Sequence, residues 1–156
     1  MRVSTYRWTQ AVGAAGVVFL VSAAAAVTAS AQAPAGAGSS VGSGVYTDDQ
    51  AKRGEATATK MCTSCHGPEL SGGEAGPTLV GLEFLGNWNN LTGGDLYDRV
   101  QSTMPADAPG TLTPQQVSDV MSYIFKLNKF PAGTTELPTD VAALKGIKIE
   151  GAQPAK

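Results

Sequence analysis

The sequence predicts an all-α protein of three or four short helices joined by loops rich in glycine and proline. Apolar side chains recur at steps of three and four residues in several segments, and helix-capping signals precede them. No segment alternates apolar and polar residues over a useful length, as a half-buried strand would. Short helices with long glycine-rich loops enclose only a thin core, so we expect another group to fill its centre.

The first 31 residues have the three parts of an export signal. Arg2 and Arg7 precede an uncharged run over residues 11–27, and Ala29-Ser30-Ala31 forms a small-x-small cleavage site. The alternative is an uncleaved membrane anchor, because a span needs roughly 17–25 apolar residues. The weakly hydrophobic Ala and Gly composition and the cleavage site favour removal. We therefore expect a periplasmic protein with no membrane span after cleavage, in an oxidising compartment.

The chain left after cleavage suits one domain with a modest core. It starts at Gln32 and has about 125 residues. Losing two arginines takes the net charge from −2 to −4, and an acidic chain without a basic run argues against nucleic acid as a partner. Residues 32–45 are uncharged Gly, Ser, Ala, Pro and Val with Gln32, which predicts a flexible leader or a mere spacer before a folded domain over 46–133.

The first helix is expected over residues 48–60. Thr47 followed by Gln50 is a capping-box pattern, and two aspartates lie in the positive first turn. Gly54 in the interior costs about 1 kcal/mol relative to alanine. It marks either the close approach of another element or a tolerated defect.

Two more helices are expected, over 94–102 and 114–127. Thr92 with Asp95 caps the first of these, and Pro105 ends it. The second starts with a further capping box and a proline at its first position, and it carries an apolar stripe made of Val117, Val120, Met121, Ile124 and Phe125.

The segments between and after these helices have weaker patterns. Residues 67–91 predict a loop with one short turn at 79–84. The tail, residues 134–156, has one short apolar set, which predicts either a short turn or loose wrapping: Leu137, Val141 and Leu144.

Both cysteines, Cys62 and Cys65, and the single histidine, His66, lie within five positions. C-x-x-C-H is the attachment signature of c-type haem. Cysteines three residues apart on a helical turn project in nearly the same direction, so they can form two thioether bonds to one porphyrin. The next histidine then lies beneath the iron as an axial ligand. One covalently bound haem c would supply the apolar surface that the thin core lacks.

Three other uses of this cluster are weaker. A thioredoxin-like dithiol requires a βαβ frame, which the sequence does not predict. A zinc site requires four ligands, and the chain has no further Cys or His. A structural disulfide would leave His66 without a role.

Met104 is the expected second axial ligand. It precedes a proline in the small and polar stretch "STMPADAPG", where packing gives little reason for a methionine. Met61 lies on the wrong side of the attachment turn, and Met121 belongs to the apolar stripe of the last helix. The alternative is an open or water-ligated iron with Met104 as a lid.

These features together resemble a known family: residues 46–133 look like a class I mono-haem cytochrome c. The matching pieces are Gly54, the Cys62–His66 block, Gly76-Pro77-Thr78-Leu79, Met104-Pro105 and a final helix with Tyr123. The stretches "GPELSGGEAGPTLVG", "FLGNWNNLTGGDLYDRVQSTMPADAPGTLT" and "YIFKLNKFPAG" are similar to small bacterial cytochromes and to haem domains associated with quinoprotein alcohol dehydrogenases. The resemblance implies the cytochrome c fold around one haem.

The resemblance also implies roles for individual residues. The carbonyl of Pro77 would accept a hydrogen bond from the ring of His66, which orients the ligand. Leu79 would pack on the haem, and Trp88 would reach a haem propionate through its indole N–H unless it is simply a core aromatic.

Gly54 would let the first and last helices cross near Tyr123. The family commonly has an aromatic residue four positions after this glycine, where this chain has Ala58. Either the crossing is looser or Tyr123 fills the gap alone.

His/Met ligation leaves no open iron position and raises the reduction potential, which favours electron transfer over catalysis. We therefore expect no catalytic residue and a one-electron carrier between a dehydrogenase or respiratory complex and an oxidase or other cytochrome. Partners would meet the haem edge near Cys62, Cys65 and the Met104 loop. The alternatives are a dedicated haem subunit of a quinoprotein dehydrogenase and, requiring Met104 to leave the iron, a haem peroxidase or ligand sensor.

Overall fold

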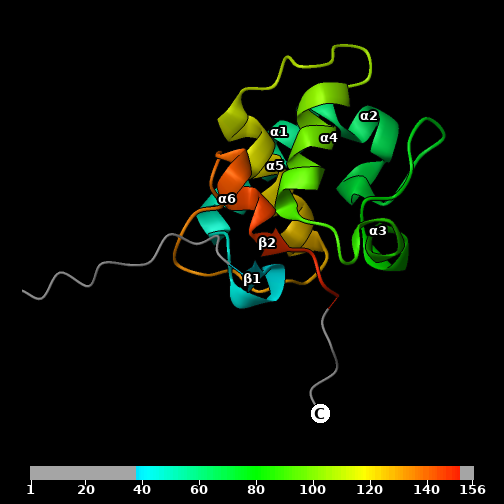
Figure 1. Ribbon diagram of the computed structural model, residues 1–156. Helices are drawn as coiled ribbons and strands as arrows, with labels where there is room; N and C mark the ends of the chain where they lie inside the picture. The colour runs from blue at the N-terminus through cyan, green and yellow to red at the C-terminus, as the bar shows by residue number, and fades with distance from the viewer. Residues whose placement is uncertain (1–37, 152–156) are drawn as a thin grey trace, which may run out of the picture. The chain divides into compact units, whose positions relative to one another are not determined.

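The computed structural model describes residues 38–151, in which six α-helices are the main elements (Figure 1). The expected signal, residues 1–31, lies outside the described residues. No helix within 38–151 is long and apolar enough to cross a membrane. The all-α prediction is confirmed, with these elements: β1 (Ser39–Ser40), η1 (Val41–Ser43), α1 (Asp48–Met61), α2 (Thr63–His66), η2 (Pro68–Leu70), α3 (Gly81–Trp88), α4 (Gly93–Thr103), α5 (Pro114–Leu127), α6 (Val141–Lys145) and β2 (Ile147–Lys148).

The crossing of α1 and α5 is the closest packing in the described fold. A Cβ atom at Gly54 would overlap the backbone oxygen of Asp119, and it would lie 3.0 Å from the Cβ of Tyr123. Gly54 therefore marks a close approach and is not a tolerated defect. Ala58, one turn further on, is completely buried, so the crossing stays close without an aromatic residue there.

An ion pair fixes this crossing from the side. The Nε and Nη2 atoms of Arg53 donate to the two carboxylate oxygens of Asp119, each over 3.0 Å. Nη2 also donates to Glu136 over 2.9 Å. Because Asp119 is only 6% exposed, its charge is matched by a two-pronged partner rather than by water.

The helices expected at 48–60, 94–102 and 114–127 are α1, α4 and α5. Both capping boxes predicted for α4 and α5 are complete. The box at α1 is only half formed: the hydroxyl of Thr47 accepts from the backbone N–H of Gln50. The side chain of Gln50 turns inward instead and binds the tail.

The short turn expected at 79–84 is in fact the longer helix α3. Its N-cap, Val80, has no capping side chain, so the local sequence carries no start signal. Asn128 of α5 replaces that signal, because its Oδ1 accepts from Gly81 N and its Nδ2 donates to Leu79 O, each over 2.9 Å. A tertiary contact thus starts this helix, and sequence periodicity cannot show such a contact.

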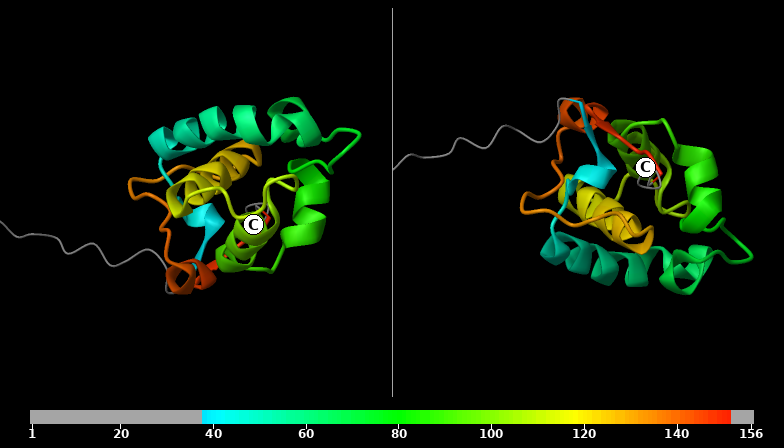
Figure 2. Two further views of the ribbon diagram at one scale, coloured as in Figure 1. Left: turned by 90° about the horizontal axis from the view of Figure 1, so that it is seen from above. Right: turned by 90° about the horizontal axis from the view of Figure 1, so that it is seen from below.

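The tail is built into the fold rather than loosely wrapped. The Nε2 atom of Gln50 donates to Leu137 O over 3.0 Å, and Leu137 N donates to Gln50 Oε1 over 2.7 Å. Ser118 donates to Pro138 O over 2.7 Å. Figure 2 shows this orange stretch beside the start of α1, on the side remote from α3.

Residues 38–45, where the composition predicts a flexible leader, also pack against the tail. Strands β1 and β2 pair in parallel, with Ser39 opposite Ile147. Val41 and Ile147 are both completely buried. Val45, the second valine of this stretch, is only 3% exposed, so both of its apolar side chains lie in the core.

The Gly54→Ala variant tests the crossing. We expect it to lower the free energy of unfolding by about 2–3 kcal/mol, because the new methyl group forces α1 away from α5. Gly86→Ala in α3 is the control, since nothing lies within 4 Å of a Cβ there. This control should be neutral or stabilise by about 0.5–1 kcal/mol. Equal stabilities of the two variants in urea unfolding would contradict the close crossing.

Candidate functional site

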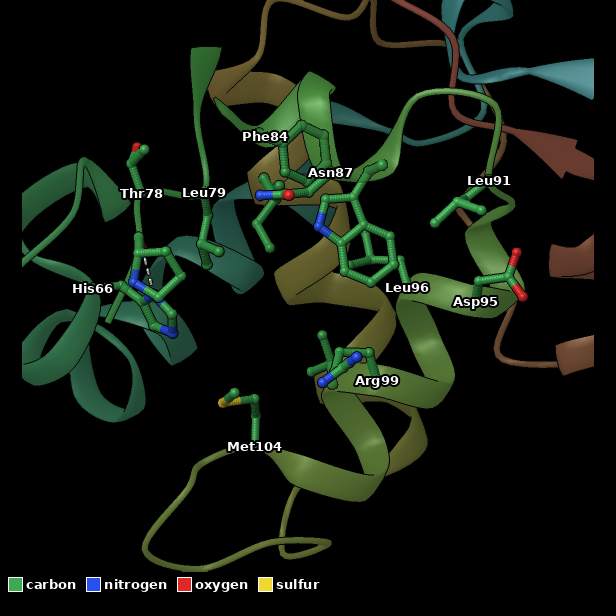
Figure 3. A pocket seen from close by; sticks show the side chains of 14 residues that line it. His66, Thr78, Leu79, Phe84, Asn87, Leu91, Asp95, Leu96, Arg99 and Met104 are labelled. Atoms are coloured by element: carbon green, nitrogen blue, oxygen red, sulfur yellow. Dashed lines mark hydrogen bonds between the residues drawn. The ribbon is translucent and has the colours of Figure 1, made fainter. Parts of the chain in front are cut away.

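A cavity of about 630 Å³ lies between the turn after α2, α3 and α4. Its volume is typical of pockets for small molecules and cofactors. Thirteen of its lining residues come from 66–104, and Ile124 of α5 closes it. Figure 3 shows side chains from these separate elements directed into one space. The apolar walls are Leu79, Phe84, Trp88, Leu91, Leu96, Val100 and Ile124.

His66 lies on one wall of this cavity, at the end of α2. The backbone turns there through Cys62, which ends α1 and accepts from His66 N over 2.9 Å. The ring Nδ1 is 2.7 Å from the carbonyl oxygen of Pro77. A carbonyl can only accept, so Nδ1 carries a proton, and in the neutral ring Nε2 then has the lone pair. The contact is the one that the resemblance implies, and it leaves one nitrogen of a buried ring available as a ligand.

Gly76 makes room for this ring. A Cβ atom at Gly76 would lie 3.0 Å from His66 Nδ1 and 3.2 Å from the backbone oxygen of Cys65. A side chain at this position would therefore push the ring away from Pro77. The turn after α2 is thus shaped around the histidine.

Met104 reaches the same cavity from α4, where it is the C-cap residue. In Figure 3 its sulfur points into the cavity from a different element than His66. Gln101 holds the following loop: its Nε2 donates to Leu112 O over 3.0 Å, and Tyr97 OH donates to its Oε1 over 3.4 Å. Both ends of the loop that follows Met104 are therefore tied to α4.

Cys62 and Cys65 lie on the same turn as His66, and neither is among the residues that line the cavity. Cys62 is half-buried and packs against the core, Cys65 is exposed, and both are free thiols. Burial raises the pKa of the Cys62 thiol, and the neighbouring Cys65 raises it further.

The remaining expected residues also line the cavity. Trp88 packs on Phe84 with ring centroids 6.4 Å apart, and it is only half-buried. This position suits either role considered for it, core aromatic or propionate partner. Leu79 presents its side chain to the cavity, while Asn128 binds its carbonyl.

Sequence reasoning missed three polar residues at the cavity, Asn87, Asp95 and Arg99. Asp95 and Arg99 are four residues apart, so they share one side of α4. The carboxylate of Asp95 accepts from the hydroxyl and backbone N–H of Thr92, which lowers its pKa, and nearby Lys145 lowers it further. The only sequence signal that could have placed Asp95 and Arg99 at the cavity was their helical spacing next to the apolar Leu96 and Val100.

These residues fit a covalently held haem. The walls are apolar, a ring nitrogen with a free lone pair and a thioether sulfur enter from different elements, and two thiols lie on the histidine turn. His66 and Met104 would be the axial ligands, and Cys62 and Cys65 the covalent anchors. The cavity thus has space for the group that the thin core was expected to need.

Comparison with known proteins gives one match. Residues 49–124, from α1 to the end region of α5, match the family model described as cytochrome C oxidase, cbb3-type, subunit III. No curated protein and no solved structure matches the chain significantly.

The Gly76→Ala variant tests the arrangement of the His66 ring. We expect a loss of about 1–3 kcal/mol in the free energy of unfolding, because the methyl group crowds the ring. The Nδ1–H proton signal of His66 should shift as its bond to Pro77 weakens. Gly42→Ala, with its nearest atom 3.7 Å away, is the control for a glycine without such a neighbour. An unshifted proton signal in Gly76→Ala would show that the ring does not depend on this space.

Proposed function

From the match of residues 49–124, which identifies a class I c-type cytochrome haem domain and so an electron-transfer haem protein, we propose a finer function. The chain is a periplasmic one-electron carrier whose haem has His/Met ligation. It would pass electrons between a dehydrogenase or respiratory complex and a terminal acceptor. One observation carries the proposal: His66 and Met104 enter the same apolar cavity from α2 and α4.

A haem bound here supplies reversible one-electron chemistry at its iron. The carbonyl of Pro77 keeps the His66 ring oriented and its Nε2 basic. As a ligand, the soft sulfur of Met104 would favour the reduced metal and so raise the reduction potential. If His66 and Met104 both bound the iron, no position would remain vacant for a substrate, which supports electron transfer rather than catalysis.

Attachment would use the two thiols of the histidine turn. The S–H bond of each cysteine would add across one vinyl group, so that a C–S and a C–H bond replace the S–H bond and the vinyl π bond. One helical turn separates Cys62 and Cys65, which supports this role. A covalent tether suits an exported protein, since the haem is not lost by dilution.

A second candidate is a dedicated haem subunit of a larger redox complex, such as a quinoprotein dehydrogenase. The description of the matched family, which names an oxidase subunit, favours this candidate. Mild extraction from the source cell separates the two: a free carrier elutes alone, whereas a subunit co-purifies with its catalytic partner in a fixed ratio.

The Met104→Ala variant tests the axial ligand. We expect loss of the Met–iron charge-transfer band, a lower reduction potential and new binding of carbon monoxide to the reduced protein. Met121→Leu, a volume-conserving change in the core, should keep the band. If the native protein already binds carbon monoxide at neutral pH, the peroxidase or sensor alternative gains and His/Met ligation is wrong.

The Gln101→Ala variant tests how the Met104 loop is held. Loss of its bond leaves the Leu112 carbonyl without its partner and costs about 1–2 kcal/mol. The charge-transfer band should then disappear at a lower temperature than in the native protein, ahead of global unfolding. Gln115→Ala removes a bond to Asp119 on α5 instead, so the band and the global transition should stay together. Identical melting of the band in both variants would remove Gln101 from this role.

A further inference from the structure

Charge is unevenly divided between the part of the chain that forms the cavity and the rest. Residues 62–112 supply every lining residue except Ile124. Their one basic residue is Arg99, against six exposed acidic residues: Glu69, Glu74, Glu83, Asp95, Asp98 and Asp107. The other described residues, 38–61 and 113–151, carry seven acidic and seven basic residues. The net negative charge of the described domain therefore belongs to the cavity segment, 62–112.

Tail charges that approach the cavity segment reduce this excess without cancelling it. Lys145 lowers the pKa of Asp95, and Lys148 lies opposite Thr92 in an isolated bridge. Glu150 precedes Gly151, whose N–H binds Asn89 of the cavity segment. With these three included, seven acidic residues face three basic ones. The excess is thus greatest on the loop after α2, on α3 and on the Met104 loop.

Apolar exposure is concentrated in the same region. Three large apolar side chains are exposed in the described residues, and all lie in the cavity segment or next to it: Met61, Leu82 and Leu91. Leu82 of α3 is 89% exposed and is followed by the acidic Glu83. Apolar contacts with a charged rim are the usual composition of a protein–protein interface.

We propose that the cavity segment is a docking surface for a redox partner whose own surface is rich in lysine and arginine. This inference rests on the proposed electron-transfer function and adds the chemistry of the partner. Complementary charge speeds encounter and orients the two proteins. A short-lived contact of this kind brings the haem edge to the partner and releases it after one electron has passed.

Two small oxidants of opposite charge test the field of this surface. The reduced, haem-loaded full chain is mixed with tris(phenanthroline)cobalt(III), a cation, or with ferricyanide, an anion. In each case one electron leaves the ferrous haem and reduces cobalt(III) to cobalt(II) or ferricyanide to ferrocyanide. Raising the ionic strength from 0.01 to 0.1 M shortens the screening length from about 30 to about 10 Å. We expect the cobalt reaction to slow by about tenfold and the ferricyanide reaction to become faster.

Two double variants with the same change in net charge show which part of the surface causes the salt dependence of the cobalt reaction. Glu83→Gln with Asp107→Asn removes two negative charges from the cavity segment, and Asp48→Asn with Asp49→Asn removes two from the remote side at the start of α1 (Figure 2). The first pair should reduce the salt effect on the cobalt reaction from about tenfold to about threefold, whereas the second should leave it near tenfold. Equal reductions in both pairs would show that only net charge acts, and would overturn the proposal.

A lysine decapeptide extends the test to a polypeptide. It should slow the cobalt reaction of the native chain and of the remote pair by occupying the docking surface, and slow the cavity-segment pair much less. The same slowing in all three would also overturn the proposal. The Met–iron band, recorded on the same samples, reports separately on the proposed function. A missing band would contradict His/Met ligation, whereas a missing charge effect would contradict only the docking surface.

Discussion

The crossing of α1 and α5 at Gly54 is the constraint on which the site depends. The C-terminal end of α1 leads directly into Cys62 and the His66 turn. The C-terminal part of α5 carries Ile124, which closes the cavity, and Asn128, which holds the loop before α3. Two walls of the cavity are thus extensions of the same helix pair. Their spacing is set where no side chain separates the two backbones.

Side-chain amides hold the segments that this pair does not reach. Gln50 binds the tail, Asn128 the start of α3 and Gln101 the Met104 loop. Each amide satisfies backbone groups of a segment with little regular structure of its own. Such groups are costly to leave unpaired when buried, so a few side chains determine the path of long glycine-rich loops. Two of these amides hold segments that line the cavity: Asn128 binds Leu79, and Gln101 binds the loop that follows Met104.

Much of the frame and the centre of the site could be predicted from sequence, because their signals are local. Capping residues and periodicity located α1, α4 and α5, and the spacing of Cys62, Cys65 and His66 indicated the cofactor. The start of α3, the integration of the tail and the burial of Val41 depend on partners far along the chain. Arg99 was missed for a different reason: it has helical spacing, but an exposed charge on a helix is common and does not by itself indicate a cavity.

The parallel pairing of β1 and β2 determines how this domain can be transplanted. Its two strands come from opposite ends of the described residues, and each brings a fully buried side chain, Val41 and Ile147. A unit cut at 46 and 133 would keep all the proposed haem contacts, but it would lose β1, α6 and β2 and so uncover the side of α4 that α6 and β2 contact. The smallest portable electron-transfer module is therefore 38–151. Because the two strands run in parallel, a fusion protein built on it would have its two junctions at opposite ends of the β1–β2 pair.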